Sequence, residues 1–371
     1  MIFQVVHIIT KILIVGSNTR PLSKSLKELG YTVYATSFFD LLDQRDVVDK
    51  LIVPDEFSFF DMNLLIDLAM EYVNEVDYII CSNDIDVSRF PKSKIIGNYD
   101  VDAVNNKYKL YKKLHKDFLM PETFKLNDVH EAFEISDASD KRYIVKPIYG
   151  SGGVNIDWLN EDSVVDDSFI LQEYIDGNSV SSSFLSYPSG DVDMITTSDQ
   201  IIGSRRLNAT SFLYCGNVTP LVNDSNKIYN ISSKISRMYN LVGSNGIDFV
   251  MQDNKVYVIE VNPRIQGTFE NIEKSFEFNL ANAHINACNN NKVNIPSVKK
   301  FSVKLMPYSF KDAYYNLNDV SNVHDVSDEN YLIKKSYPIC TIITSDRILE
   351  NAMIKSEMIQ KRVYDSVVKK V

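Results

Sequence analysis

The first hundred residues alternate between short apolar runs and amphipathic stretches. Residues 11–16, KILIVG, form a continuous apolar run that is typical of a buried strand. A helix is predicted to begin near Arg20 and Pro21, because proline suits a first helical turn, and to end at Gly30. The apolar segments VVDKLIVP, VDYIICS and SKIIGN predict further strands. Strands that alternate with helices predict a parallel sheet covered by helices, which we place at residues 1–104.

The pattern changes three times after residue 104. Residues 105–117 form a basic helical stretch, and strand-like segments follow at 142–147 and 169–186. A helix is expected over 226–241, followed by two strands, SNGIDFVMQ and KVYVIEVNP. A polar, asparagine-rich connector precedes a tail with short strands and a last amphipathic helix from about Leu349. We therefore divide the rest of the chain into units at 105–177, 178–290 and 291–371.

Composition narrows the classes of function. The chain has 371 residues, 44% hydrophobic and 24% charged, which is enough apolar material for a sizeable core. A formal net charge of −10 argues against nucleic-acid binding, because neutralising phosphates requires a basic surface. The apolar start, MIFQVVHIIT, is either an added strand or a segment upstream of the first unit. It lacks a basic region, and no apolar run approaches the roughly 20 residues of a membrane span.

The cysteines and histidines form no recognisable metal or redox motif. Cys81, Cys215, Cys288 and Cys340 are far apart, and the chain contains no C-x-x-C. The five histidines are scattered without the spacing of zinc ligands. Reduced thiols and the lack of a membrane span predict a cytoplasmic protein.

The strand KVYVIEVNP and the arginine after it carry polar side chains at alternate positions. Glu260, Asn262 and Arg264 start on one face, since side chains two residues apart in a strand share a face. The preceding strand supplies Asp248, and carboxylate and amide oxygens are suitable ligands for Mg²⁺. Arg264 would lie beside the metal, where it would bind a carboxylate or a phosphoryl group. The alternative is an edge strand whose polar side chains face water.

A glycine-rich loop follows the strand that contains Lys146. Residues 150–153, Gly-Ser-Gly-Gly, leave backbone N–H groups accessible to a phosphate, and Lys146 supplies a positive charge nearby. The loop is neither a Walker A motif nor a dinucleotide fingerprint, and a glycine-rich hairpin turn is the alternative. Residues 171–177, LQEYIDG, end a strand whose backbone would bind an adenine edge and whose carboxylate would reach ribose hydroxyls; an ordinary strand end is the alternative.

These segments, in this order, resemble the ATP-grasp superfamily over residues 105–290. The shared features are a lysine on an early helix, K-P followed by a glycine loop, Q-E-Y-I-x-G, an acidic strand and E-x-N-P-R. The twelve residues from Asp248 to Glu260 match the spacing of the family's magnesium site. The segments GSNTRPL, GSRRLN, YCGNVTP and NPRIQGT are similar, as a set, to the predicted ATP-dependent carboligases of archaeal type.

The resemblance implies an α/β fold with the ATP-grasp architecture. Residues 1–104 would be the pre-ATP-grasp domain with its parallel sheet. Residues 105–177 would be the small lobe that covers the nucleotide, and residues 178–290 the large lobe with the magnesium site. Residues 291–371 resemble the small β-rich domain that follows in biotin-carboxylase-like members.

The resemblance also implies a role for each matching residue. Lys107 and Lys146 would bind the ATP phosphates, and Lys146 and Arg264 would act in catalysis, with Arg264 stabilising an acyl phosphate or its transition state. The mobile loop over the phosphates would comprise Gly150, Ser151, Gly152 and Gly153. The adenine hinge would comprise Gln172, Glu173, Tyr174 and Ile175, acting mainly through backbone groups. One or two Mg²⁺ ions, with Mn²⁺ as the alternative ion, would be held by Asp248, Glu260 and Asn262.

The substrate side of the site is less defined in the sequence. Arg205 or Arg206 would hold a substrate carboxylate, and a solvated basic turn is the alternative for this pair. Tyr214 and Asn217 would line the substrate pocket. Arg20, at a predicted helix start, would either contact an anion or lie on the surface.

The implied function is ATP- and Mg²⁺-dependent ligation of a small carboxylate, activated as an acyl phosphate, to an amine or similar nucleophile, with release of ADP and phosphate. A bicarbonate-dependent carboxylase is the alternative in chemistry. Biotin itself is not an expected acceptor, because Gly267 and Thr268 follow Arg264 where biotin carboxylase has an acidic residue, and Glu270 lies further on. A third hypothesis is a non-catalytic, ATP-binding regulatory protein. The expected partners are small molecules, and the dimers formed by many relatives make a homodimer a further expectation.

Overall fold

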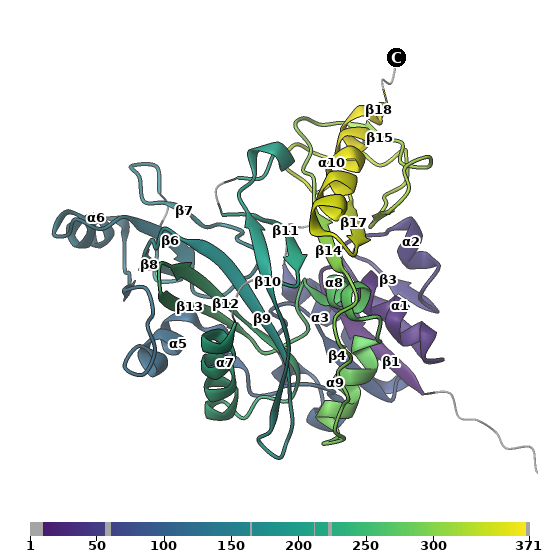
Figure 1. Cartoon of the computed structure of the whole chain (residues 1–371), viewed down its shortest axis with the longest axis horizontal. Coiled ribbons are helices and arrows are strands. Elements are labelled where there is room, and N and C mark those ends of the chain that lie inside the picture. Colours follow the sequence, from purple (N-terminus) through teal and green to yellow (C-terminus); the bar gives the residue numbers. More distant parts are fainter. Residues whose placement is uncertain (1–9, 56–60, 164, 211, 222–224, 369–371) are drawn as a thin grey trace, which may run out of the picture.

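The computed structural model describes residues 10–55, 61–163, 165–210, 212–221 and 225–368. The apolar start of the chain lies almost entirely outside these residues, so its role stays a prediction. In Figure 1 the N-terminal unit (purple) lies on one side of a large central sheet, and a smaller sheet with α6 (Val129–Asp137) lies on the other. Within the described ranges, no helix has the length and apolar character needed to cross a membrane.

The N-terminal unit contains a four-stranded parallel sheet in the order β3-β2-β1-β4. Its strands are β1 (Lys11–Val15), β2 (Thr32–Thr36), β3 (Lys50–Ile52) and β4 (Tyr78–Cys81). Its helices are α1 (Arg20–Glu28), α2 (Leu42–Arg45), α3 (Met62–Met70) and α4 (Asp102–Asn105), with 3₁₀ turns η1 (Val73–Glu75), η2 (Val87–Arg89) and η3 (Lys92–Lys94). The predicted parallel α/β arrangement is confirmed. Alternate side chains of β1 enter two different hydrophobic clusters, which explains its continuous apolar run.

The segment SKIIGN does not form the strand that its apolar residues predicted. Its first residues belong to the 3₁₀ turn η3, and Ile95 forms a single parallel bridge with Ile79. Gly97 follows with a φ of +138°, which is outside the range of an extended strand. The backbone therefore turns before a second pair of residues can align.

A second, smaller sheet follows α4 in the chain, with antiparallel strands in the order β5-β8-β6-β7. The strands of this small sheet are β5 (Thr123–Lys125), β6 (Tyr143–Pro147), β7 (Asp157–Trp158) and β8 (Phe169–Glu173). Helix α5 (Lys107–Leu114) precedes β5, and α6 lies between β5 and β6 in the chain. Ala132 of α6 packs with Val145 and Leu171 in its core. The backbone N–H of Lys107 donates to the carbonyl of Ile148 at 3.1 Å, which fixes α5 beside the end of β6.

The central sheet has eight strands in the order β13-β12-β9-β10-β11-β14-β17-β16, and neighbouring strands are antiparallel. The strands are β9 (Asn178–Ser186), β10 (Val192–Ile202), β11 (Tyr214–Thr219), β12 (Gly243–Gln252), β13 (Lys255–Asn262), β14 (Phe301–Leu305), β16 (Val323–His324) and β17 (Thr341–Asp346). A short 3₁₀ turn, η4 (Arg205–Leu207), follows β10. Helix α7 (Asn226–Met238) contributes Ile228 and Ile235 to the hydrophobic cluster on one face.

Helices α8 (Phe269–Phe276) and α9 (Leu280–Cys288) connect the central sheet to the N-terminal unit. Leu22 and Leu26 of α1 share one hydrophobic cluster with Leu185 of β9, Ile272 of α8 and Leu280 of α9. This shared cluster holds the N-terminal unit against the sheet that carries the predicted metal ligands.

The segment after residue 290 continues the central sheet. Strand β14 pairs with β11, β17 pairs with β14, and α10 (Leu349–Asp365) packs against both β14 and β17. The short strands β15 (Tyr314–Tyr315) and β18 (Val367–Val368) form a separate antiparallel pair. The C-terminal segment therefore shares a sheet with residues 178–290, and β14 brings Lys304 to the central cavity.

Candidate active site

A cavity of about 570 Å³ is lined by residues of the N-terminal unit, the small sheet and the central sheet. The N-terminal unit contributes Ser17, Asn18, Ser82 and Asn83, and the small sheet contributes Lys146, Ser151, Gly152, Gly153, Gln172, Glu173, Tyr174 and Ile175. The central sheet and the segment after β13 contribute Gln200, Tyr214, Asp248, Glu260, Asn262, Arg264, Gln266, Glu270 and Lys304. Most of the residues that the sequence singled out for ATP and metal binding therefore meet at one cavity.

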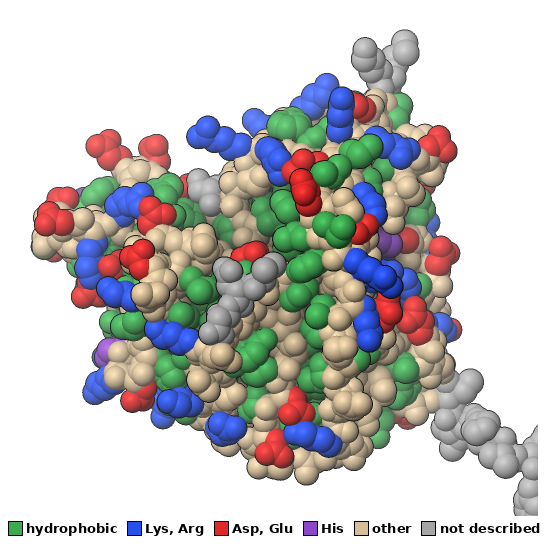
Figure 2. All heavy atoms as spheres, in the orientation of Figure 1, with side chains coloured by type: hydrophobic (Ala, Val, Ile, Leu, Met, Phe, Trp, Pro, Cys, Tyr) green, Lys and Arg blue, Asp and Glu red, His purple; other side chains and the backbone are tan. Residues whose placement is uncertain are grey.

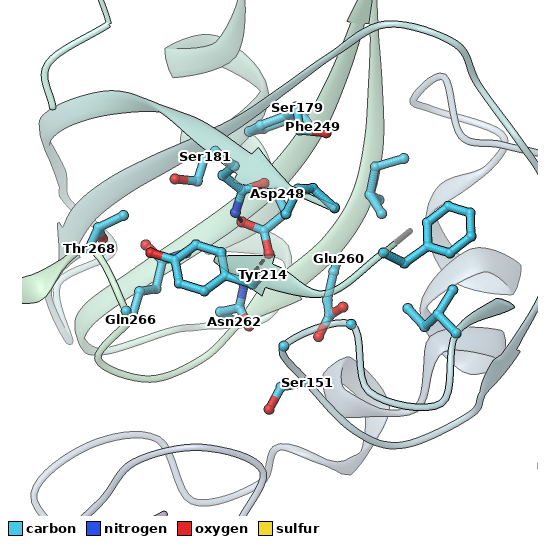
Figure 3. Close-up of a pocket in the computed structure, with 18 of the residues that line it drawn as sticks. Ser151, Ser179, Ser181, Tyr214, Asp248, Phe249, Glu260, Asn262, Gln266 and Thr268 are labelled. Atoms are coloured by element: carbon cyan, nitrogen blue, oxygen red, sulfur yellow. Dashed lines mark hydrogen bonds between the residues drawn. The ribbon is translucent and has the colours of Figure 1, made fainter. Parts of the chain in front are cut away.

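The predicted metal ligands lie on adjacent strands and point to the same side. Asp248 of β12 is directly opposite Glu260 of β13, and the register shifts after this pair because of a bulge. The Asn262 side-chain amide donates to Asp248 Oδ2 at 2.9 Å, and Gln200 Nε2 donates to Asp248 Oδ1 at 2.9 Å. Figure 3 shows Asp248, Glu260 and Asn262 converging on the cavity.

The electrostatics of this group fit a divalent cation. Burial, followed by the charge of Glu260, raises the pKa of Asp248 to about 7. Two facing carboxylates with an amide oxygen nearby are the hard oxygen donors that Mg²⁺ takes in proteins. A bound cation would remove the repulsion that raises this pKa, so Asp248, Glu260 and Asn262 are suited to hold Mg²⁺.

Two lysines face each other beside these carboxylates. Lys107 Nζ donates to the Gly150 carbonyl at 2.6 Å and lies 3.8 Å from Glu260 Oε1. Lys146 is almost completely buried, and burial, followed by the nearby charge of Lys107, lowers its pKa to about 8. A buried lysine whose charge is disfavoured in this way favours an anionic ligand such as a polyphosphate.

The glycine loop has backbone conformations that only glycine adopts easily. Gly150, Gly152 and Gly153 have φ values of +128°, +71° and +78°. A Cβ on Gly153 would lie 1.8 Å from the Phe212 carbonyl oxygen. The Gly152 carbonyl accepts a hydrogen bond from the Tyr214 backbone N–H at 3.0 Å. The loop therefore packs backbone to backbone against the segment that leads into β11.

The predicted adenine hinge, residues 172–175, lies at the end of β8. The Gln172 amide donates to Thr123 Oγ1 at 2.9 Å, and Glu173 accepts from the Glu122 N–H and pairs with Lys141 at 3.2 Å. The side chains of Gln172 and Glu173 are therefore engaged within the small sheet, and the backbone N–H groups of Glu173 and Tyr174 donate to the carbonyls of Glu122 and Arg142.

Three aromatic rings cluster next to the predicted hinge, and two of them, Tyr174 and Phe212, line the cavity. Tyr174 lies 4.6 Å from Trp158 between ring centroids, and Phe212 lies 5.2 Å from Trp158. Arg142 stacks over both Trp158 and Tyr174. Phe212 belongs to the loop before β11 of the central sheet, and Trp158 belongs to β7 of the small sheet. This cluster therefore joins the small sheet to the central sheet.

Arg264 forms an ion pair with a residue of the N-terminal unit. Its NH1 atom lies 3.0 Å from Asp84 Oδ1, and both side chains are largely buried at the cavity. Sequence reasoning missed Asp84, which follows β4 and comes to Arg264 only through packing. The Arg264 NH1 atom has no hydrogen-bond partner among the described residues, so the guanidinium can still donate to a ligand.

The structure does not bring every predicted substrate residue to the cavity. Arg205 and Arg206 are exposed on η4, and Arg206 NH1 pairs with Glu357 of α10 at 2.8 Å. Figure 2 shows other Lys and Arg side chains interspersed with Asp and Glu on the face it displays. Asn217 is fully buried and accepts from the Asn271 amide at 2.9 Å, so it has a structural role.

Tyr214 and Arg20 have different positions relative to the cavity. Tyr214 lines it, beside Asn262 and Gln266 in Figure 3, and its buried hydroxyl has no hydrogen-bond partner among the described residues. Arg20 is buried just behind the lining, where it contacts Glu270 at 2.8 Å and Asp325 at 2.6 Å. Although burial lowers it, the pKa of Arg20 is raised above its usual value by the charges of Asp325 and Glu270.

Sequence reasoning did not find Lys304 or assign Glu270 a position in the cavity. The stretch FSVKL of β14 places Ser302 and Lys304 on one face, which was the available signal. Both side chains are polar in an otherwise apolar strand and both are buried. Nothing local in the sequence shows that this face meets the segment after β13.

Sequence comparisons identify the family of the chain. The family model of the ATP-grasp domain matches residues 104–268. An uncharacterized protein of Methanocaldococcus jannaschii is 35% identical over 358 residues, covering 91% of this chain and 89% of its own length. The tyramine–L-glutamate ligase of the same organism is 26% identical over 242 residues, covering 62% of this chain and 66% of its own. The chain belongs to the ATP-grasp superfamily.

Solved structures share the fold over nearly the whole chain. One is the biotin carboxylase domain of the Hydrogenobacter thermophilus 2-oxoglutarate carboxylase, a dimer in complex with MgADP, ADP and bicarbonate. It has a TM-score of 0.72 at 15% identity and covers 97% of this chain and 90% of that one. The N5-carboxyaminoimidazole ribonucleotide synthetase of Thermotoga maritima has a TM-score of 0.68 at 17% identity, covering 96% and 98%. At these identities the likeness shows the ATP-grasp fold.

Proposed function

We propose that the chain is an ADP-forming ligase that activates a small carboxylate as an acyl phosphate and joins it to an amine. The observation that carries this proposal is the convergence of an oxygen ligand set, Lys146 and Arg264 on one cavity, with Lys107 buried 3.8 Å from Glu260. Phosphoryl transfer requires these groups, because catalysis of that step consists mainly of positioning and charge stabilisation. The relative named as a tyramine–L-glutamate ligase supports an amine as the nucleophile.

Several residues of the chain act in the first step, which forms the acyl phosphate. Lys107 and Lys146 bind and orient the phosphates of ATP. Mg²⁺ held by the β12–β13 carboxylates would neutralise charge on the phosphoryl oxygens. Arg264, fixed by Asp84, holds the substrate carboxylate in line with the γ-phosphorus. A carboxylate oxygen bonds to that phosphorus, and the bond from phosphorus to the departing ADP oxygen breaks.

The second step forms the carbon–nitrogen bond. The amine nitrogen bonds to the acyl carbon, and phosphate leaves with the electron pair of the broken carbon–oxygen bond. The amine proton passes to solvent or to a nearby base. Arg264 stabilises the negative oxygens of the acyl phosphate and of its transition state. No side-chain nucleophile is required, so the covalent chemistry takes place between the substrates.

The first experiment measures nucleotide product and phosphate release with MgATP. The purified chain is mixed with amino acids, dicarboxylates, amines and bicarbonate, singly and in pairs. ADP and phosphate that form only with a carboxylate–amine pair support the proposal. Stimulation by bicarbonate alone supports the carboxylase alternative, and AMP with pyrophosphate overturns the acyl phosphate. ATP binding without turnover on any mixture favours the regulatory alternative.

The metal assignment has its own test. Glu260→Gln is expected to lower turnover about 100-fold or more, because it removes a charged oxygen ligand worth several kcal/mol in the transition state. The matched control is Asp253→Asn, which neutralises an exposed carboxylate in the turn between the same two strands. Circular dichroism checks that both variants are folded. Equal turnover in the two variants would contradict the metal assignment.

A further inference from the structure

Two charged residues of the cavity have no part in nucleotide or metal binding. The charged side chains that line the cavity are Lys146, Glu173, Asp248, Glu260, Arg264, Glu270 and Lys304. Glu173 pairs with Lys141, outside the hinge. Lys146, Arg264 and the carboxylates of Asp248 and Glu260 belong to the proposed chemistry. Glu270 in the first turn of α8 and Lys304 on β14 remain.

Glu270 and Lys304 lie close together without forming a tight pair. Lys304 Nζ is 3.7 Å from Glu270 Oε2, which is longer than a hydrogen bond. Its one hydrogen bond among the described residues goes to the Gly267 carbonyl, at 3.3 Å. An ammonium group has three donors, so Lys304 retains capacity for a ligand.

Buried partners fix the position of Glu270. One guanidinium nitrogen of Arg20 lies 2.8 and 2.9 Å from the two Glu270 oxygens. Arg20 is in turn held by Asp325 at 2.6 Å and by Asp43 at 3.3 Å. A single nitrogen satisfies only part of a carboxylate, which has about four acceptor positions. Glu270 is therefore held rigidly while its cavity side can still accept hydrogen bonds.

We infer that Glu270 and Lys304 bind the ammonium and the carboxylate of an α-amino acid substrate, an inference that rests on the proposed ligase function. Opposite charges fixed side by side are complementary to a zwitterion, whose own charges are separated by one carbon atom. A simple amine would leave Lys304 without a counterion from the substrate, and a dicarboxylate would place a like charge against Glu270. The pair therefore selects a molecule that carries both charges.

The inference also specifies which part of the substrate reacts. When both α-groups are bound by this pair, the side chain is the part left to reach Arg264 and the metal site. Residues 264–270 border the cavity as one segment, so both ends of such a substrate contact the same wall. The carboxylate that is phosphorylated then belongs to the side chain, and the substrate is an acidic amino acid.

The test measures binding by calorimetry in the presence of MgADP. L-Glutamate is compared with glutarate, which lacks the ammonium group, and with 4-aminobutyrate, which lacks the α-carboxylate. L-Aspartate is compared in the same way with succinate and 3-aminopropanoate. The wild-type chain should prefer one amino acid over both of its analogues by about tenfold or more.

Two variants separate the roles of the pair. Glu270→Gln should abolish the preference over the analogue without the ammonium, because an amide has no negative charge. Lys304→Met should abolish the preference over the analogue without the α-carboxylate. Arg20 keeps Asp325 and Asp43 in both variants, so its charge stays compensated. The matched controls are Glu277→Gln and Lys300→Met, which alter a more exposed pair (2.9 Å) between the other end of α8 and the start of β14.

The outcomes distinguish this inference from the function on which it rests. If neither amino acid binds, or if both variants keep the wild-type preferences, the inference is wrong and the pair is an internal salt bridge. ADP formation with another carboxylate would overturn the inference and leave the ligase function standing. Failure to bind MgADP or MgATP at all would overturn the ligase function itself.

Discussion

His284 is a buried histidine that connects three parts of the molecule. Its Nδ1 atom accepts from the Ser244 N–H of β12 at 2.8 Å, and its Nε2 atom lies 3.2 Å from the Ile96 carbonyl. These contacts require a neutral ring with the proton on Nε2. Burial lowers the pKa of His284 to about 4, from about 6.5 for an exposed histidine. The His284 ring therefore binds a proton less readily in the folded protein than in the unfolded chain.

This difference predicts a loss of stability in acid. The unfolded state binds the proton first as pH falls, so the free energy of unfolding decreases from about pH 6.5 downward and levels off below about pH 4. A shift of this size corresponds to about 3 kcal/mol in total, of which about 2 kcal/mol is lost between pH 7 and pH 5.

The assay compares urea unfolding of the wild type and His284→Gln at pH 7 and pH 5, followed by circular dichroism. Glutamine can donate and accept in the same place but does not titrate. Burial raises the pKa of Glu273 to about 7, so this group opposes the acid effect, but it is present in both proteins and cancels. The variant should lose about 2 kcal/mol less than the wild type between the two pH values.

A control variant and a clear contrary result complete the test. His130→Gln, at an exposed position on α6, should keep the pH dependence of the wild type. If the wild type and His284→Gln lose equal stability between pH 7 and pH 5, His284 is not buried in a neutral form. The packing of α9 between β12 and the N-terminal unit would then need revision.

Three further predictions concern the cavity and its supports. Phe212→Leu removes a ring that packs on Trp158, the single tryptophan of the chain. The variant should bind MgATP about fivefold more weakly in a tryptophan fluorescence titration. An unchanged affinity would argue against the contact. Gly153→Ala places a Cβ 1.8 Å from the Phe212 carbonyl oxygen, at a backbone φ of +78°. The variant should bind MgATP at least about tenfold more weakly in the same titration. Wild-type affinity would mean that the loop does not pack against this carbonyl. Arg20→Met leaves Asp325 without its counterion and should lower the free energy of unfolding by about 3–5 kcal/mol in urea, and a loss below about 1 kcal/mol would contradict the buried network.

Local sequence was sufficient for many of the elements, although the predicted strand SKIIGN does not form, and for several of the residues that line the cavity. The alternation of Glu260, Asn262 and Arg264 predicted a shared face, and these side chains do line one cavity. The glycines after Lys146 predicted a loop whose backbone is open to a ligand, and Gly152 and Gly153 line the cavity with positive φ values. Such features depend on periodicity and on the conformational range of single residues, which are properties of neighbouring positions.

Polarity alone did not separate ligand-binding residues from others. Arg206 carries the positive charge expected of a residue that binds a substrate carboxylate, but it pairs with Glu357 at the surface. Asn217 is polar within a strand, but it serves the buried contact with Asn271. A polar side chain in a strand is compatible with solvent, a buried hydrogen bond or a ligand, and only its surroundings decide between them.

The sequence by itself determined the alternation of strands and helices in the N-terminal unit, the two-carboxylate strand pair and the glycine loop, because each follows from spacing within one segment. The tertiary structure alone decided that Asp84 holds Arg264 and that Arg20 meets Asp325, 305 residues further along the chain. It also decided that Lys304 enters the cavity beside Glu270. These contacts depend on how sheets and helices bury their apolar faces against one another, and no local pattern encodes which distant polar groups then become neighbours.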